Sequence, residues 1–283
     1  MTAIDLYHLR SWIGRSRTDE DLIAVRHALL MAATLDYSET PRIREGERLP
    51  PLWHWIYFLE ALPPGELGPD GHPARGEFLP PVRLRHRMWA GGRVSFAAPV
   101  PIGSIVRKES CVLKLDHKTG RSGELVFVTV LHEMKTQQGS LLIREEHDIV
   151  YRGDMPPGER SGAPVTAPAA QFTKVYTPDS TLLFRYSALT FNGHRIHYDA
   201  DYCREKEGYE NLVIHGPLVA TLLAVFAEEV SDRQIRELSY RAISPALLGG
   251  PVTLHASMHE ENVALYATTE FGAVCMQADA VLG

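Results

Sequence analysis

The stretch from Phe191 to Tyr202, FNGHRIHYDADY, places two histidines, an asparagine and two aspartates close together in the chain. Histidine can take up or release a proton near neutral pH, because its unperturbed pKa is about 6.5. The stretch is therefore compatible with an acid/base centre, a metal centre or a packed polar turn. A lone histidine in a polar turn is more often structural than catalytic, so the surrounding elements decide between these interpretations.

The sequence HGPL, His215 to Leu218, opens an apolar segment of helical length that runs to Val230. Pro217 suits the first turn of a helix, where its missing N–H costs nothing. Gly216 allows backbone or ligand to approach closely. Because a helix begins with unpaired N–H groups and a positive dipole end, we predict that the Gly216 N–H binds a developing oxyanion.

The polar turn followed by the HG helix start resembles the hydratase-2 or MaoC-like family of enoyl-thioester hydratases and dehydratases. That family has Asp or Asn, a His five positions on, and later an HG helix start, which Asn192, His197 and His215-Gly216 match. The strings LPPLWHWIYFLE, DGHP, FLPPVRLRHRMWAGG and HDIVYR resemble its long subgroup. That subgroup hydrates dicarboxylic, C4- or C5-type enoyl-CoA esters and includes mesaconyl-CoA and itaconyl-CoA hydratases.

Adding water across a C=C bond conjugated to a thioester needs a base, a proton for the alpha carbon and stabilisation of the enolate oxygen. We predict that Asn192 and His197 hold the water and that His197 takes its proton. The Gly216 N–H would bind the thioester oxygen, and the resemblance implies syn addition. Much of the family has Asp in place of Asn192. An amide orients water but is no base, so the acid/base role falls on His197.

The string RLRHRMWAGG places three arginines in alternation, so they share one face of a strand. A solvated basic face is the simpler explanation for such a string. A dicarboxylic substrate nevertheless needs an arginine, whose planar fork matches a carboxylate, and Arg87 is the candidate. The predicted substrate-binding residues are Arg87, Trp89, Gly91, His194 and His215.

A metal centre is the main rival interpretation of the polar turn. His194 and His197 form an HxxH pair, with Asp199 and Asp201 nearby. A zinc or iron site needs three or four converging ligands, which spacing in a turn does not secure. The sequence has no matching Cys or His cluster to complete the set. We therefore predict no metal and no cofactor, with CoA being part of the substrate.

An internal similarity predicts the fold. Residues 153–171 are rich in Pro, Gly, Ala and Ser and read as a linker between halves 1–152 and 172–283. Each half is predicted to have an apolar strand running into a polar turn (25–39 and 183–199), an apolar helix (49–62 and 213–230), and about four alternating strands. An apolar helix needs a sheet around it. We therefore predict an α+β double hotdog, each half an antiparallel sheet wrapped around a long central helix.

The first half is predicted to be catalytically degenerate. Asp36 occupies the place of the motif, but Pro41 stands where the histidine would be. This half is expected to form the tunnel that accepts the acyl chain or CoA.

Composition limits the partners and the compartment. The chain has 283 residues and a formal net charge of -6, which favours neither nucleic acid nor an anionic membrane. The absence of a long apolar run argues against a membrane span. Three scattered cysteines, Cys111, Cys203 and Cys275, indicate a reduced, cytoplasmic protein. Exposed sheet edges favour a homodimer.

The sequence therefore predicts an enoyl-CoA hydratase acting on a short branched dicarboxylic acyl-CoA thioester, with itaconyl-CoA or mesaconyl-CoA going to citramalyl-CoA. One alternative is a 3-hydroxyacyl-thioester dehydratase of fatty-acyl metabolism, which a long apolar tunnel without arginine would favour. A hotdog thioesterase commonly uses a carboxylate, so Asn192 argues against that class. A non-catalytic acyl-CoA binder would leave the thioester unchanged.

Overall fold

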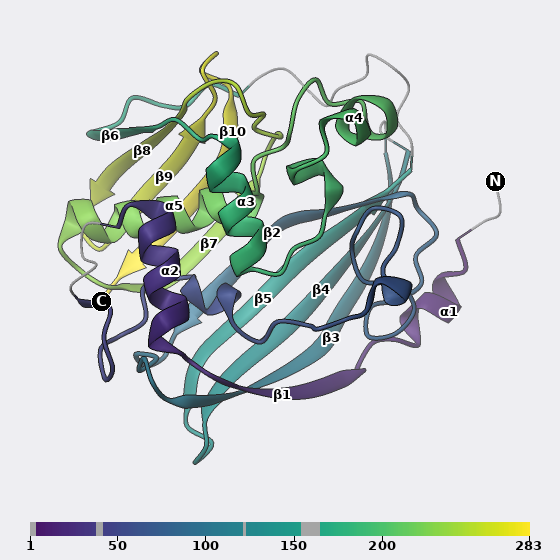
Figure 1. The fold of residues 1–283 in the computed structure, drawn as a ribbon, viewed down its shortest axis with the longest axis horizontal. Helices are drawn as coiled ribbons and strands as arrows, with labels where there is room; N and C mark the ends of the chain where they lie inside the picture. The colour runs from purple at the N-terminus through teal and green to yellow at the C-terminus, as the bar shows by residue number, and fades with distance from the viewer. Residues whose placement is uncertain (1–3, 38–41, 121–122, 154–164) are drawn as a thin grey trace.

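The computed structural model describes residues 4–37, 42–120, 123–153 and 165–283. The strands of this part of the chain are β1 (Ser16–Leu22), β2 (His86–Phe96), β3 (Ile105–Gly120), β4 (Gly123–Thr136), β5 (Leu141–Arg152), β6 (Phe172–Tyr176), β7 (Ile235–Ala242), β8 (Val252–His259), β9 (Asn262–Thr268) and β10 (Val274–Leu282). They form one antiparallel sheet in the order β1-β3-β4-β5-β2-β7-β10-β9-β8-β6. The two halves of the chain thus contribute adjoining halves of the sheet (Figure 1).

The four strands predicted in each half are confirmed as β2–β5 and β7–β10. In β4 every second residue from Val126 to Val130 is buried, namely Val126, Val128 and Val130, and the residues between them are less buried. The outermost strands β1 and β6 were not predicted. Neither has a buried residue, so neither carries the apolar alternation that identifies a half-buried strand.

The central helix of the second half is confirmed as α5 (Gly216–Ser231), with Pro217 in its first turn. It packs against β7, β8, β9 and β10. Buried residues lie on nearly every side of it from Leu218 to Ala227, as expected for a helix enclosed by a curved sheet.

The predicted central helix of the first half is wrong. Within 49–62 the structure has only a 3-10 helix, Trp53–Ile56. Leu52 and Phe58 on either side of it have φ of 66° and 56°, a left-handed conformation that ends a right-handed helix. The apolar composition of this segment reflects its burial and not a helix, since Trp53 and Ile56 are almost fully enclosed.

The predicted strands at 25–39 and 183–199 are also wrong, because both segments begin as helices. These are α2 (Val25–Leu35) and α3 (Ser180–Leu189). In α2 the buried residues are Ala28, Met31, Ala32 and Leu35, a helical spacing that the apolar composition concealed. The Asp179 side chain caps α3 by accepting from the Leu182 N–H at 2.7 Å.

Helices α2 and α3 contact each other and lie side by side (Figure 1). Each is followed by the motif position of its own half, Asp36 after α2 and Asn192 after α3. The similarity of the halves is therefore present in the structure, although its first element is a helix. Pro41 lies outside the described residues.

The first half has an additional small core on β3, β4 and β5. It includes Val112, Val128 and Tyr151, and it is covered by α1 (Leu6–Arg10) and residues 78–84. Of the predicted linker, residues 154–164 lie outside the described part of the chain. Thr166 forms a bridge to Ala273 of the second half. No helix in the described ranges is long and apolar enough to cross a membrane.

The sheet is continuous across the two halves because β2 pairs with β7. Gly91 lies opposite Arg241 and has φ of 157°. A Cβ atom at Gly91 would overlap the backbone carbonyl oxygen of Tyr240. This close backbone approach explains why the position is glycine. The predicted role of Gly91 in substrate binding stays a prediction.

We expect Gly91→Ala to lower the free energy of unfolding by about 1–3 kcal/mol, because the new methyl group forces β2 and β7 apart. Denaturant unfolding measures the loss. Gly65→Ala is the control, since a Cβ atom there meets no atom within 4 Å. Equal stability of the two variants would contradict the account of this junction.

Candidate active site

The predicted catalytic turn follows α3 directly. Asn192 closes this turn through its side chain, because its Oδ1 accepts the His194 N–H at 2.9 Å. The chain then enters a 3-10 helix, Arg195–His197. The preceding Phe191 has φ of 49°, which turns the backbone sharply at the end of α3. The asparagine thus holds the shape of the turn, and its NH2 group is the part available to orient water.

His197 is 7% exposed and has one ring nitrogen fixed. Its Nδ1 lies 2.7 Å from the carbonyl oxygen of Val213. Because a carbonyl only accepts, Nδ1 carries the proton and Nε2 presents a lone pair. Burial lowers the pKa of His197 to about 4, although the bond to Val213 acts in the opposite direction. The ring is therefore neutral at physiological pH, as the predicted role of base requires.

His215 lies directly against His197. The two rings stack with centroids 3.6 Å apart and an interplanar angle of 18°. His215 is fully buried, its Nε2 is 2.8 Å from the Ser187 hydroxyl, and burial lowers its pKa well below the usual range. The predicted pocket residue thus packs against the ring of His197, the predicted base.

We expect the pH profile of kcat/KM to show an acid limb near pH 4 to 5. His197 has a pKa of about 4 in the folded chain and about 6.5 when unfolded. Between these values the unfolded chain binds more protons, so His197 makes the folded state more stable as pH rises to 6.5, and adds no further pH dependence above that. The folded-state ring is neutral over most of this window and becomes protonated only near its lower end. Thermal unfolding at each pH separates titration from acid unfolding, and a limb near 6.5 would contradict this assignment.

Gly216 begins α5, as predicted, and Trp89 of β2 packs against it. A Cβ atom on Gly216 would lie 2.8 Å from Cε3 of Trp89. Trp89 is held in turn by Tyr240, with stacked rings 4.8 Å apart at 15°. The first half of the chain therefore supplies the wall beside the predicted oxyanion site.

An open depression of about 380 Å³ leads to His197. It is lined by Ser180, Thr181, Phe184, His197, Tyr198 and Leu212. Phe184 and Tyr198 are more than half exposed. Polar and apolar side chains both line this depression, which gives access to the predicted catalytic ring.

Arg87 differs from its neighbours in the alternating arginine string. Arg83 and Arg85 are exposed, whereas Arg87 is half-buried and pairs in register with Tyr151. Burial has the largest influence on the pKa values of Asp70, His72 and His194, and the charge of Arg87 acts in addition to lower each of them. Arg87 is thus near enough to the predicted site for its charge to act there, as a residue that binds a substrate carboxylate must be.

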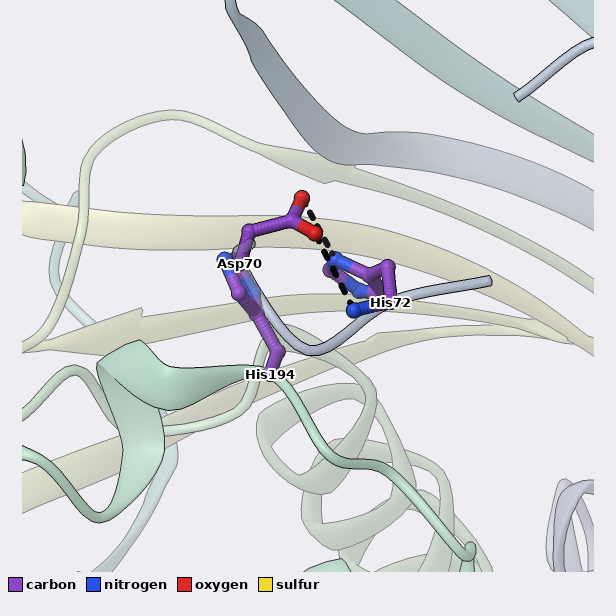
Figure 2. Close-up of side chains that lie close together, drawn as sticks. All are labelled: Asp70, His72 and His194. Atoms are coloured by element: carbon purple, nitrogen blue, oxygen red, sulfur yellow. Dashed lines mark hydrogen bonds and ion pairs between the residues drawn. The ribbon is translucent and has the colours of Figure 1, made fainter. Parts of the chain in front are cut away.

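Asp70 and His72 join the site, and we did not predict either. Asp70, His72 and His194 lie close together (Figure 2), with one potential ligand atom from each within 4.8 Å of the others. His72 Nδ1 is 3.3 Å from Asp70 Oδ2, and the rings of His72 and His194 are 4.1 Å apart. The ring of His194 lies 5.5 Å from that of His197. The string DGHP resembles the long subgroup and was the available sequence signal for these two residues, but nothing in the sequence assigned them a role.

The HxxH interpretation of the polar turn does not fit the geometry. Asp199 is engaged by Arg195 at 2.7 Å and by the Tyr202 N–H at 2.9 Å. His197 uses Nδ1 for Val213, and His194 turns to His72 instead. The Asp70, His72 and His194 set has a ligand chemistry that metals accept, but Arg87 and Arg75 lie close to it and lower the pKa of His72. Their charge disfavours a cation there and favours an anion.

Comparison with known proteins assigns the family. The sequence profile of hydroxyacyl-thioester dehydratase type 2 matches residues 52–248. The chain belongs to this family. It is also 42% identical to the mesaconyl-C(4)-CoA hydratase of Chloroflexus aurantiacus over 281 residues, which cover 96% of this chain and 97% of the relative. The predicted resemblance to hydratases and dehydratases of thioesters is thereby confirmed, and this dehydratase-type chain is an enzyme.

Solved structures agree on the fold of this type 2 family member. A MaoC-like dehydratase from Phytophthora capsici superposes with a TM-score of 0.72 at 16% identity, covering 99% of this chain and 98% of that chain. A conserved protein from Mycobacterium tuberculosis described as a double hotdog superposes with a TM-score of 0.57 at 12% identity, covering 96% of each chain. The predicted double hotdog is confirmed.

Proposed function

We propose that this type 2 dehydratase-family enzyme adds water reversibly across the C=C bond of a short branched dicarboxylic enoyl-CoA. The observation that carries the proposal is His197, a buried neutral imidazole with Nδ1–H bound to Val213 and Nε2 free. The similarity to a mesaconyl-C(4)-CoA hydratase favours the corresponding thioester, 3-methylfumaryl-CoA, with citramalyl-CoA as product.

The proposed mechanism assigns one role to each group. The Asn192 amide and His197 Nε2 hold the water, and Nε2 takes its proton as the oxygen attacks the beta carbon. Negative charge moves to the thioester oxygen, where the Gly216 N–H at the start of α5 stabilises it. His197 then returns the proton to the alpha carbon on the same face. The stacked, neutral His215 favours a transient charge on His197, because no second positive charge opposes it.

A fatty-acyl 3-hydroxyacyl-thioester dehydratase is the second candidate, and the family name supports it. Hydration and dehydration share one site, so the two candidates differ in substrate. The half-buried Arg87 near the site favours the dicarboxylic substrate, because its guanidinium matches a free carboxylate that a fatty-acyl chain lacks.

A panel of thioesters tests the proposal. Itaconyl-CoA, both mesaconyl-CoA isomers and crotonyl-CoA are compared by chromatographic loss of the unsaturated thioester, with free thiol followed in parallel. We expect turnover on a dicarboxylic thioester without thiol release. Preference for crotonyl-CoA would support the fatty-acyl candidate, thiol release would indicate a thioesterase, and unchanged thioester would indicate a binder.

We further propose that the enzyme needs no metal or redox cofactor, is cytoplasmic and forms a homodimer. The mechanism above uses only side-chain and backbone groups, and Cys111, Cys203 and Cys275 are free thiols. Light scattering in solution measures the oligomeric state.

A further inference from the structure

A loop of the first half reaches into the catalytic turn of the second. The Arg195 N–H donates to the Asp70 carbonyl oxygen at 2.9 Å. The backbones of Gly71 and Gly193 are so close that a Cβ atom on Gly71 would overlap the Gly193 carbonyl. The loop is therefore fixed against the turn, and it places His72 at a defined position beside His194.

The charges around His72 describe an anion site. The Asp70 carboxylate stays ionised, because the His72 hydrogen bond and the Arg87 charge lower its pKa despite burial. His72 Nδ1 faces this carboxylate, so the Nε2 side remains for a ligand. Among the described residues, the charged and titratable groups that act on the ring or contact it are Asp70, Arg75, Arg87, His194 and His197.

The chemistry of the proposed substrate requires an anion site close to His197. In 3-methylfumaryl-CoA the free carboxylate is attached to the carbon that water attacks. That carboxylate must therefore lie next to the water on His197. The chain of rings from His197 through His194 to His72, with centroid distances of 5.5 and 4.1 Å, leads from the water to the loop.

We propose that His72, oriented by Asp70, and Arg87 bind the free carboxylate of the substrate, so that the first half of the chain selects dicarboxylic thioesters. This inference rests on the proposed function. His72 takes one proton from solvent on binding and donates from Nδ1 to Asp70 and from Nε2 to the substrate. The catalytically degenerate half thus supplies specificity, beyond the predicted tunnel.

Succinyl-CoA and butyryl-CoA form a matched test pair. Neither has a C=C bond, and they differ only by a carboxylate or a methyl group at the beta carbon. We expect calorimetry to show wild type binding succinyl-CoA at least about tenfold more tightly. His72→Ala should reduce that ratio by about tenfold and leave butyryl-CoA affinity unchanged, and Asp70→Asn should reduce it less. His259→Ala, at an exposed position, should change nothing.

An unchanged ratio in folded His72→Ala would overturn the inference. If that variant does not fold, His72→Gln, which keeps a polar side chain, and Asp70→Asn take its place. An unchanged ratio in both of these variants would then overturn the inference. Stoichiometric Zn²⁺ binding that is lost in His72→Ala would overturn it in favour of a metal site. A wild type that is inert on every enoyl-CoA but discriminates through His72 refutes the proposed function alone. An active hydratase with an unchanged ratio refutes this inference alone.

Discussion

Replacing His197 with alanine is expected to lower kcat by about 10²- to 10⁴-fold, the usual contribution of a general base. The buried ring combines a fixed tautomer, a free Nε2 and a pKa of about 4. Neither Asn192 nor the stacked His215 can replace it, since an amide is no base and His215 is buried beneath the ring. The measurement is steady-state hydration of the preferred thioester.

His259→Ala is the matched control for His197→Ala, because it removes an exposed imidazole on β8. Thermal unfolding shows whether the loss reflects folding, and binding of a saturated acyl-CoA shows whether the pocket remains. A folded His197→Ala variant that keeps more than about a tenth of the wild-type kcat would contradict the assignment, because losing a general base costs more than that.

Gly216→Ala is expected to lower kcat by about 10²-fold, comparable to the loss of an oxyanion donor. The added Cβ atom would lie 2.8 Å from Cε3 of Trp89. Trp89 cannot yield easily, because it stacks on Tyr240. The first residue of α5 must therefore move, and its N–H moves with it.

A double-mutant cycle separates this displacement from other effects of the methyl group. Trp89→Leu removes the ring that Gly216→Ala would strike, so the double variant should regain part of the lost kcat. Gly65→Ala controls for glycine replacement as such. Strictly additive losses, or full activity in Gly216→Ala, would contradict the assigned role of the α5 N-terminus.

The sequence predicted the second half better than the first. The α5 helix is marked by its HGPL start and its apolar length, and the strands β7–β10 by their alternation, and the structure confirms these elements. The segment 49–62 is as apolar as α5, but left-handed Leu52 and Phe58 interrupt it. Composition indicates burial in both cases, whereas the helix itself depends on backbone conformations that the sequence does not reveal.

The candidate site was predictable where its residues are neighbours in the chain. Asn192, His197 and Gly216 follow from one motif and one helix start. Asp70 and His72 are more than a hundred residues from His194, and only the docking of the loop brings them together. The backbone constraint on Gly91 was likewise hidden from the sequence, since it comes from the Tyr240 backbone in the other half.

Hydration in water enriched in ¹⁸O tests the central claim most directly. Wild type acting on 3-methylfumaryl-CoA should give a citramalyl-CoA product that carries one ¹⁸O atom in its hydroxyl group, without released CoA, and His197→Ala should form it far more slowly. Release of CoA with ¹⁸O in a free carboxylate would contradict the account, because it would show attack on the thioester carbonyl carbon and not on the double bond.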